Sequence, residues 1–152
     1  MTELAIRWQR LVDEDGRTCE RCGATGEALD GAVRRLARAL GELGIRTVLE
    51  THTLDPAVFG ENPLESNRIW LAGRPLEDWL AATVGRSACC SACGDSECRT
   101  VTVDGTTYEA IAPELILEAG LLAAAHVLRD RRVSGSGGGA GCCSPDDPPS
   151  GC

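Results

Sequence analysis

The chain has 152 residues, a formal net charge of −8 at pH 7 and 43% hydrophobic residues, which suffices for one domain with an apolar core. The acidic balance argues against binding of nucleic acid or anionic lipid, because both require a basic face. No segment approaches the about 18 apolar residues of a membrane span. The N-terminus lacks the pattern of a secretory signal, so we expect a cytoplasmic protein.

The first part of the chain predicts a strand–helix–strand unit. Residues 4–11 alternate between apolar and polar side chains, as in a half-buried strand. Apolar residues recur at spacings of three and four over residues 27–43, which predicts an amphipathic helix, and Gly44 suits its C-terminal end. Residues 45–54 are rich in β-branched side chains and predict a second strand, parallel to the first.

The middle of the chain is less regular. Residues 55–66 contain proline and glycine and predict an irregular segment. A short strand over 67–71 and a short helix over 75–82 follow. Residues 87–99 predict a cysteine-rich loop.

A hairpin and a helix follow this loop. Residues 100–103 and 106–110 flank Asp104-Gly105, which is a strong signal for a tight hairpin turn. Pro113 suits the first position of a helix over residues 113–129. That helix is apolar nearly all round, so we expect it to be well buried.

The composition changes abruptly near the C-terminus. Residues 134–141 form a Gly/Ser-rich linker, and the rest of the chain lacks the apolar residues of a core. We therefore expect a folded domain over residues 1–132 and a flexible, cysteine-bearing tail over residues 133–152.

The nine cysteines dominate the chemistry of the chain. In a reducing compartment such a density indicates metal binding or redox chemistry rather than a disulfide framework. The count is odd, so at least one thiol cannot pair within the chain.

The order of the predicted elements, with a Cys-x-x-Cys loop after the first strand, resembles that of a thioredoxin-like domain. More specifically, the chain resembles DUF2703, a family of small prokaryotic proteins of unknown function placed among thioredoxin-like folds. The matching segments are residues 8–12, 18–22, 63–70, 73–77 and 89–95, within a resemblance over residues 3–130. This resemblance, which excludes the tail, implies an α/β fold with a central mixed β-sheet flanked by helices. The residues themselves add a Cys-rich loop insertion and a disordered C-terminal tail.

Two departures from thioredoxins bear on activity. Residues 23–26 separate the Cys-x-x-Cys pair from the predicted helix, so we expect a weaker effect of the helix N-terminus on the first thiol. Ser66-Asn67 stands where thioredoxins place a cis-proline facing the thiols. Both departures argue against ordinary disulfide reductase activity.

Cys19 and Cys22 form the first candidate site. Two thiolates at this spacing can form a short disulfide, chelate one soft ion or contribute to a structural zinc knuckle. Arg21, between the thiols, favours the thiolate form, whereas Glu20 opposes it.

A second cluster repeats the Cys-x-x-Cys-Gly pattern of the first. Its members are Cys89, Cys90, Cys93 and Cys98. The two knuckles could share one tetrahedral zinc, or the second cluster could hold zinc or an iron–sulfur centre alone. As(III) is another candidate ligand, because three thiolates satisfy its trigonal preference. The alternative is a structural zinc that only stabilises the fold of the loop.

The tail carries a third group of thiols, Cys142, Cys143 and Cys152. The vicinal pair is similar to one on the C-terminus of mercuric reductases, which indicates capture of a soft ion and its delivery to the folded domain. Incidental cysteines in a disordered end are the alternative. His52 and His126 are expected to be structural rather than ligands.

The sequence therefore predicts a thioredoxin-like protein that binds or transfers a soft metal or metalloid ion such as As(III) or Hg(II), as in detoxification. One alternative is a thiol–disulfide oxidoreductase that uses Cys19 and Cys22 as catalytic residues. A second is a zinc-stapled, non-catalytic interaction module. Expected partners are the ion and a redox or metal-transfer protein, without nucleic acid or membrane.

Overall fold

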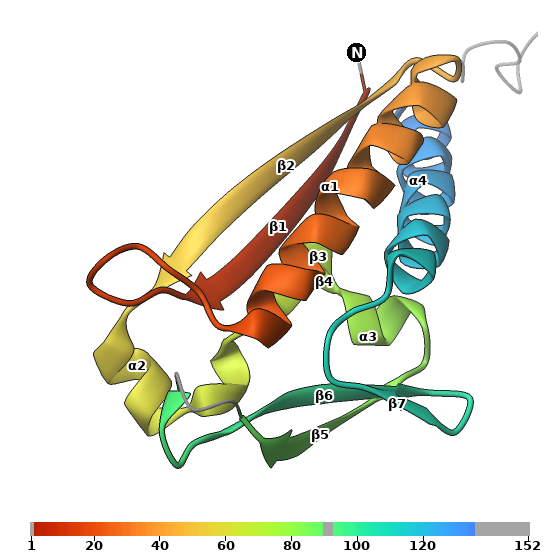
Figure 1. The fold of residues 1–152 in the computed structure, drawn as a ribbon. Helices are drawn as coiled ribbons and strands as arrows, with labels where there is room; N and C mark the ends of the chain where they lie inside the picture. Colours follow the sequence, from red (N-terminus) through yellow and green to blue (C-terminus); the bar gives the residue numbers. More distant parts are fainter. Residues whose placement is uncertain (1, 90–92, 136–152) are drawn as a thin grey trace, which may run out of the picture.

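The computed structural model describes residues 2–89 and 93–135 (Figure 1). The elements in chain order are β1 (Thr2–Leu11), α1 (Glu20–Gly41), β2 (Ile45–Leu54), α2 (Pro56–Glu61), the 3₁₀ helix η1 (Pro63–Glu65), β3 (Arg68–Leu71), β4 (Arg74–Pro75), α3 (Leu76–Trp79), β5 (Thr83–Ala88), β6 (Glu97–Val103), β7 (Thr106–Tyr108) and α4 (Pro113–Gly135). The predicted α/β class is confirmed.

The larger sheet is mixed and has the strand order β2-β1-β3-β4. β1 pairs in parallel with β2 along its whole length, from Thr2 opposite Ile45 to Leu11 opposite Leu54. β3 pairs antiparallel to both β1 and β4. The predicted strands over residues 4–11, 45–54 and 67–71 are therefore confirmed, and the connection through α1 gives the predicted parallel unit.

The core lies between the larger sheet and the two long helices. Alternate residues of β1, among them Leu4 and Ile6, are fully buried. Helices α1 and α4 pack against each other so closely that a Cβ atom added to Gly120 would lie 2.5 Å from Cδ1 of Leu36. The Ile111 amide also donates to the buried Thr25 Oγ1 at 3.0 Å, which fixes the start of α4 beside the first turns of α1.

The smaller sheet, with the order β5-β6-β7, lies near the N-terminal end of α1 (Figure 1). β6 and β7 form the predicted hairpin around Asp104-Gly105, whose φ angles of +49° and +80° are those of a primed turn. β5 pairs antiparallel with β6 from Thr83 opposite Thr102 to Ala88 opposite Glu97. This pairing turns much of the predicted cysteine-rich loop into strand, so only residues 89–96 connect β5 to β6.

The expected start of α1 is wrong. The helix begins at Glu20, so residues 23–26 are helical rather than a loop before the helix. The glycines in this segment suggested a break, but Gly26 serves close packing. A Cβ atom at Gly26 would come within 2.8 Å of the Trp8 ring, so a glycine is what lets the first turns of α1 approach β1.

Three other expectations need correction. The segment 55–66 is not irregular, because α2 and η1 occupy most of it, with the Asp55 side chain accepting from the Ala57 amide at 2.7 Å as an N-terminal cap. The helix predicted over 75–82 is only the single turn α3. α4 is longer than predicted and only half-buried.

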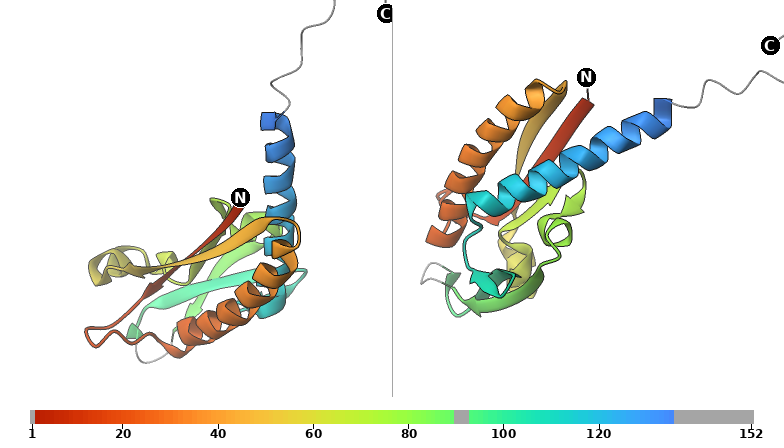
Figure 2. Two further views of the ribbon diagram at one scale, coloured as in Figure 1. Left: turned by 90° about the horizontal axis from the view of Figure 1, so that it is seen from above. Right: turned by 90° about the vertical axis from the view of Figure 1, so that its right-hand side faces the viewer.

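The burial of α4 changes along the helix: Leu115 and Ile116 are buried in its first turn, and small residues are buried further along. Ala119, Ala123 and Ala124 are buried, whereas Leu121 and Leu122 are exposed. Beyond the first turn, close contact with α1 requires small side chains on the packed face, so Leu121 and Leu122 lie on the outer side. Two further views show the C-terminal part of α4 projecting from the rest of the fold (Figure 2). Among the described residues, no helix combines the length and apolar character needed to cross a bilayer.

Candidate functional site

The Cys-x-x-Cys pair lies at the N-terminus of α1. Cys19 is the residue that precedes the helix, with extended backbone angles, and Cys22 lies in the first helical turn. Both are buried. The pair thus runs directly into a helix, contrary to the expectation from residues 23–26, and the free amides of the helix N-terminus are available to stabilise a negative charge on Cys19.

The two thiols of the pair have opposite protonation properties. The hydrogen bond from the Cys22 thiol lowers the pKa of Cys19 from 9.0 to about 5, with help from the Cys22 and Arg21 amides and the Cys93 side chain, and against desolvation. The same bond to Cys19, together with burial, raises the pKa of Cys22 far above its usual range. At neutral pH the pair therefore carries one thiolate, on Cys19, and one proton, on Cys22.

Ser66 completes the environment of Cys22. Its Oγ lies 3.5 Å from Cys22 Sγ and accepts a hydrogen bond from the Leu11 amide at 3.2 Å. The neighbouring Asn67 accepts from the Trp8 indole N–H at 3.2 Å. Ser66 thus contacts a thiol of the pair, Asn67 contacts Trp8 instead, and the described peptide bonds are all trans.

Two cysteines of the second cluster form a disulfide. Cys89 directly follows β5 and is disulfide-bonded to Cys98 of β6, with 5.2 Å between their Cα atoms. The Cys89 amide donates to the Ser96 carbonyl at 3.2 Å, which closes the base of the connection. Cys93 lies on the same connection, half-buried, whereas Cys90 lies outside the described residues.

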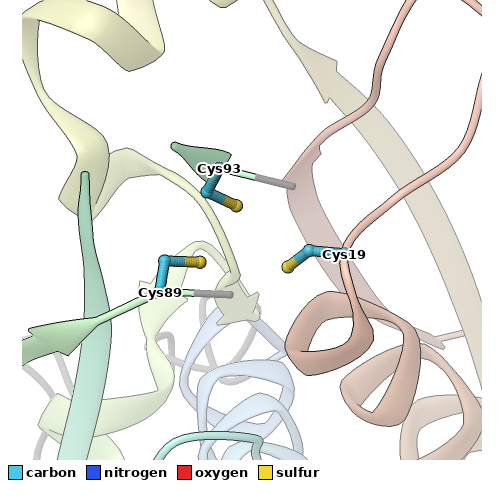
Figure 3. A group of neighbouring side chains, drawn as sticks. All are labelled: Cys19, Cys89 and Cys93. Atoms are coloured by element: carbon cyan, nitrogen blue, oxygen red, sulfur yellow. The ribbon is translucent and has the colours of Figure 1, made fainter. Parts of the chain in front are cut away.

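Three sulfur atoms from the two segments converge. The Sγ atoms of Cys19, Cys89 and Cys93 all lie within 4.8 Å of one another. Figure 3 shows the three side chains pointing toward a common space, Cys19 from the start of α1 and the other two from the β5–β6 connection. Cys22 and Cys98 adjoin this group through the hydrogen bond to Cys19 and the disulfide to Cys89.

A small cavity adjoins the group. It has a volume of about 70 Å³ and is lined by Leu11, Asp13, Arg17, Thr18, Cys19 and Cys93. A much larger cavity, about 960 Å³, lies between α3 and α4, with Trp79 and Leu122 among its lining residues, and none of its described lining residues is a cysteine. The size of the cavity beside Cys19 suits an ion rather than a large organic substrate.

Arg21 has a different role from the expected one. Its guanidinium group donates to four backbone carbonyls, those of Glu109 at 3.3 Å, Ser87 at 3.5 Å, Ala88 at 3.1 Å and Arg99 at 3.0 Å. These bonds join the first turn of α1 to both strands that carry the disulfide. Arg21 therefore holds the two cysteine segments together, and it acts on the Cys19 thiolate through its amide.

A buried ion pair that sequence reasoning missed supports the strand of Cys98. Arg99 is 7% exposed, forms a short salt bridge with Glu77 and donates to the Leu64 carbonyl at 3.0 Å. Burial lowers the pKa of Arg99, and Glu77 opposes that shift. Single arginines and glutamates carry no sequence signal for such a pair, because the partners are brought together only by the fold.

The two histidines do not join this group. His52 and His126 pair with Glu50 at 3.6 Å and Asp130 at 3.2 Å, and His126 also contacts the Trp79 ring. Cys142, Cys143 and Cys152 lie outside the described residues.

The arrangement supports two kinds of chemistry. Cys19, Cys89 and Cys93 form a group of thiol ligands that can hold a metal ion. The Cys89–Cys98 pair is also a disulfide beside a reactive thiolate. Sulfur is the sole donor type within the group, which favours soft ions over magnesium or calcium.

Comparison with known proteins defines the family without naming an activity. A family described as a domain of unknown function (DUF2703) matches residues 4–120. An uncharacterized protein of Archaeoglobus fulgidus is 42% identical over 114 residues, which cover 75% of this chain and 82% of that protein. No solved structure matches, so the thioredoxin-like assignment stays a prediction. The chain belongs to the DUF2703 family.

Proposed function

We propose that this protein binds a soft metal or metalloid ion, of the As(III) or Hg(II) type, through the thiolates of Cys19, Cys89 and Cys93. The observation that carries the proposal is the convergence of these three sulfurs within 4.8 Å. An ion held at about 2.3 Å from each sulfur would draw the three to about 4 Å from one another. Small side-chain rotations supply this contraction.

The number of ligands favours a three-coordinate ion. The described group offers three sulfurs, which matches the trigonal preference of As(III), whereas structural zinc sites take four ligands. Cys19 is already a thiolate at neutral pH, because its pKa is about 5, so the first metal–sulfur bond forms without removal of a proton.

Ion binding in this form requires a reduced site. Cys89 is half of a disulfide, and its sulfur becomes a ligand only when the bond to Cys98 is broken. A reducing compartment such as the cytoplasm supplies this state, in agreement with the localisation expected from the sequence. The folded domain is the receiving site in this proposal. The thiols of Cys142, Cys143 and Cys152 would capture the ion and deliver it.

Arsenite titration of the reduced protein tests the proposal. The starting variant is the full chain with Cys90, Cys142, Cys143 and Cys152 replaced by serine, reduced with a phosphine. We expect one arsenic per chain by native mass spectrometry, with the loss of three protons expected for three As–S bonds. The Cys19→Ser, Cys89→Ser and Cys93→Ser variants should each lose this complex.

Cys98→Ser is the matched control. It removes a cysteine of the same segment that is not a proposed ligand, so it should retain arsenite binding. Unchanged binding in the Cys19→Ser variant would contradict the proposal. Tightly held zinc in protein purified without oxidation, with no affinity for arsenite, would instead support the zinc-stapled module.

A thiol–disulfide oxidoreductase is the second candidate function. The observation that favours it is the pairing of a Cys19 thiolate with a protonated Cys22 one helical turn away, which suits attack and resolution. In this case Cys19→Ser abolishes reduction of a disulfide substrate coupled to a reductase. Cys89→Ser, which removes a proposed ion ligand outside the Cys19/Cys22 pair, leaves that turnover intact, and this separates the enzyme from ion binding.

A further inference from the structure

A disulfide and a thiol that can attack it lie side by side in this site. Cys19 Sγ is within 4.8 Å of Cys89 Sγ, and Cys89 is bonded to Cys98. Figure 3 shows the Cys19 and Cys89 side chains directed toward each other. Exchange between a thiolate and a disulfide requires approach of these two atoms and no other reagent.

We propose that Cys19 attacks Cys89, so that the Cys19/Cys22 pair and the Cys89/Cys98 pair exchange one disulfide bond within the molecule. The protein then holds two electrons on either pair and moves them between the N-terminus of α1 and the β5–β6 hairpin. This activity needs no ion, although it uses two sulfurs of the proposed ion site, those of Cys19 and Cys89.

The first step forms a mixed disulfide. The Cys19 thiolate attacks Cys89 Sγ, the bond between Cys19 and Cys89 forms, and the bond between Cys89 and Cys98 breaks. Cys98 leaves as a thiolate. No electrons enter or leave the molecule in this step.

The second step resolves the mixed disulfide. The Cys22 thiol gives its proton, through solvent, to the Cys98 thiolate and attacks Cys19 Sγ. The bond between Cys22 and Cys19 forms, and Cys89 leaves as a thiolate. The net reaction oxidises the Cys19/Cys22 dithiol by two electrons and reduces the Cys89–Cys98 disulfide by the same two.

The positions of the five described cysteines select these roles. Cys98 lies in β6, is 6% exposed and is not in the group of sulfurs around Cys19, so Cys89 is the atom attacked and Cys98 the leaving group. Cys22 lies one helical turn after Cys19 and is hydrogen-bonded to it, so Cys22 is the thiol placed to attack Cys19 Sγ. Cys93 is near both and is the competing thiol.

The backbone around the site fixes the approach. Arg21 bonds the carbonyls of Ser87 and Ala88, the two residues before Cys89, and the carbonyl of Arg99, the residue after Cys98. Arg21 is itself between Cys19 and Cys22. One side chain therefore sets the distance between the attacking pair and the disulfide, which makes Arg21 a positioning residue.

The exchange links redox state to ion binding. With the disulfide on Cys89 and Cys98, the third ligand of the proposed ion site is missing. With the disulfide on Cys19 and Cys22, the Cys19 ligand is missing instead. The proposed site is complete only when both pairs are dithiols, so the exchange and ion binding exclude each other.

Trapping of the mixed disulfide tests the exchange. The full chain with Cys90, Cys142, Cys143 and Cys152 replaced by serine is given the further change Cys22→Ser, which removes the resolving thiol. The protein is oxidised to one disulfide per chain, freed of small thiols, held at neutral pH, quenched with acid and alkylated. Peptide mapping by mass spectrometry should then recover a Cys19–Cys89 linkage, in a fraction that does not change on dilution.

Two variants complete the design. With Cys22 present, the same treatment should show Cys19–Cys22 and Cys89–Cys98 linkages that interconvert, and Cys19→Ser should leave Cys89–Cys98 unchanged. Should Cys22→Ser fail to fold by circular dichroism, Cys22→Ala serves in its place. Recovery of Cys89–Cys98 alone, or of Cys19–Cys93 in place of Cys19–Cys89, would overturn the proposal. No ion is present in this experiment, so such a failure would leave the proposed function standing.

Discussion

Residues 19–23 and 90–94 share one cysteine pattern in the sequence, and the described residues that flank the two segments differ in structure. The first segment begins a long helix and is packed into the core. The second belongs to the connection between two strands of the smaller sheet, where Cys89 pairs with Cys98. The described residues next to the second pattern are therefore those of a strand connection, whereas the first pattern lies at the start of a helix.

The backbone around each segment determines the chemistry of its thiols. At the helix N-terminus, one thiol acquires a lowered pKa and its partner a raised one, because they share a single proton near free amides. On the β5–β6 connection, antiparallel strands bring two cysteines to disulfide distance. One segment supplies a nucleophile and the other an electrophile.

Replacement of Cys19 should have the largest effect on the thiol chemistry of the site. Cys19→Ser removes the only described thiol with a lowered pKa, so we expect the loss of both arsenite binding and internal exchange. Since the bond to Cys19 is the largest cause of the raised pKa of Cys22, that pKa should also fall toward its usual range. Alkylation rates of Cys22 in the variant and in the parent protein, measured against pH, check the second expectation, and equal rates would contradict it.

The pH dependence of alkylation tests the lowered pKa of Cys19. The reaction of Cys19 with iodoacetamide should rise with pH, reach half its maximum at about pH 5 and then level off. At pH 6 it should be about tenfold faster than that of an ordinary thiol, because a large gain in thiolate exceeds the loss of intrinsic nucleophilicity. Mass spectrometry of the reduced protein resolves each site, with a short cysteine-containing peptide as the reference for an ordinary thiol. A midpoint near 9 would contradict the shared-proton arrangement.

The same shift makes the stability of the reduced protein depend on pH. A thiol with a folded pKa of about 5 and an unfolded value near 9.0 contributes stability that is complete above pH 9 and is lost as the pH falls to 5. The raised pKa of Cys22 acts in the opposite sense and only above pH 9. Urea unfolding between pH 5 and 8 should therefore show increasing stability, and Cys19→Ser should reduce the slope.

The sequence predicted the elements that local patterns determine. The strand over 45–54 and the hairpin around Asp104-Gly105 follow from β-branched residues and turn chemistry, and both are confirmed. β5 was missed because its residues are mostly exposed and show no apolar alternation, so its pairing with β6 is what makes it a strand. Local patterns carry no information on such pairing.

The sequence predicted the type of donor atom at the site but not which residues form it. Thiol ligands were expected from the number and spacing of the cysteines, but their grouping depends on contacts between residues far apart in the chain. Arg21 reaches backbone carbonyls 66 to 88 residues away, and no pattern around Arg21 indicates them. The division into a domain and a tail stays a prediction, because residues 136–152 lie outside the part of the chain described.

Replacing Arg21 should loosen the contact between the two segments. Arg21→Gln removes the guanidinium group that joins α1 to β5 and β6, so we expect internal exchange to slow by about tenfold, since small misplacements of reacting atoms reduce rates strongly. Arg34→Gln is the matched control, because the Arg34 side chain donates to the Asp30 carbonyl of its own helix. The exchange rate is measured by acid quenching, and an unchanged rate in Arg21→Gln would show that this residue does not position Cys89.

The smallest expected effect concerns the start of α1. In an exposed helix a Gly→Ala change stabilises by about 0.5–1 kcal/mol, because alanine loses less backbone entropy on folding. Gly31→Ala should behave in this way, since nothing lies within 4 Å of the added Cβ atom. Gly26→Ala should instead destabilise by about 1–3 kcal/mol, because its Cβ atom would lie 2.8 Å from the Trp8 ring.

The two glycines lie on the same helix, so the difference between them measures packing against β1 rather than helix propensity. Urea unfolding of both variants gives that difference directly. Because Gly26 follows Cys22 by one turn, a displaced ring or helix should also raise the pKa of Cys19, which the alkylation midpoint reports. Equal stabilities of the two variants would mean that the first turns of α1 are not held against Trp8, and the helical environment of the Cys-x-x-Cys pair would then lose its structural support.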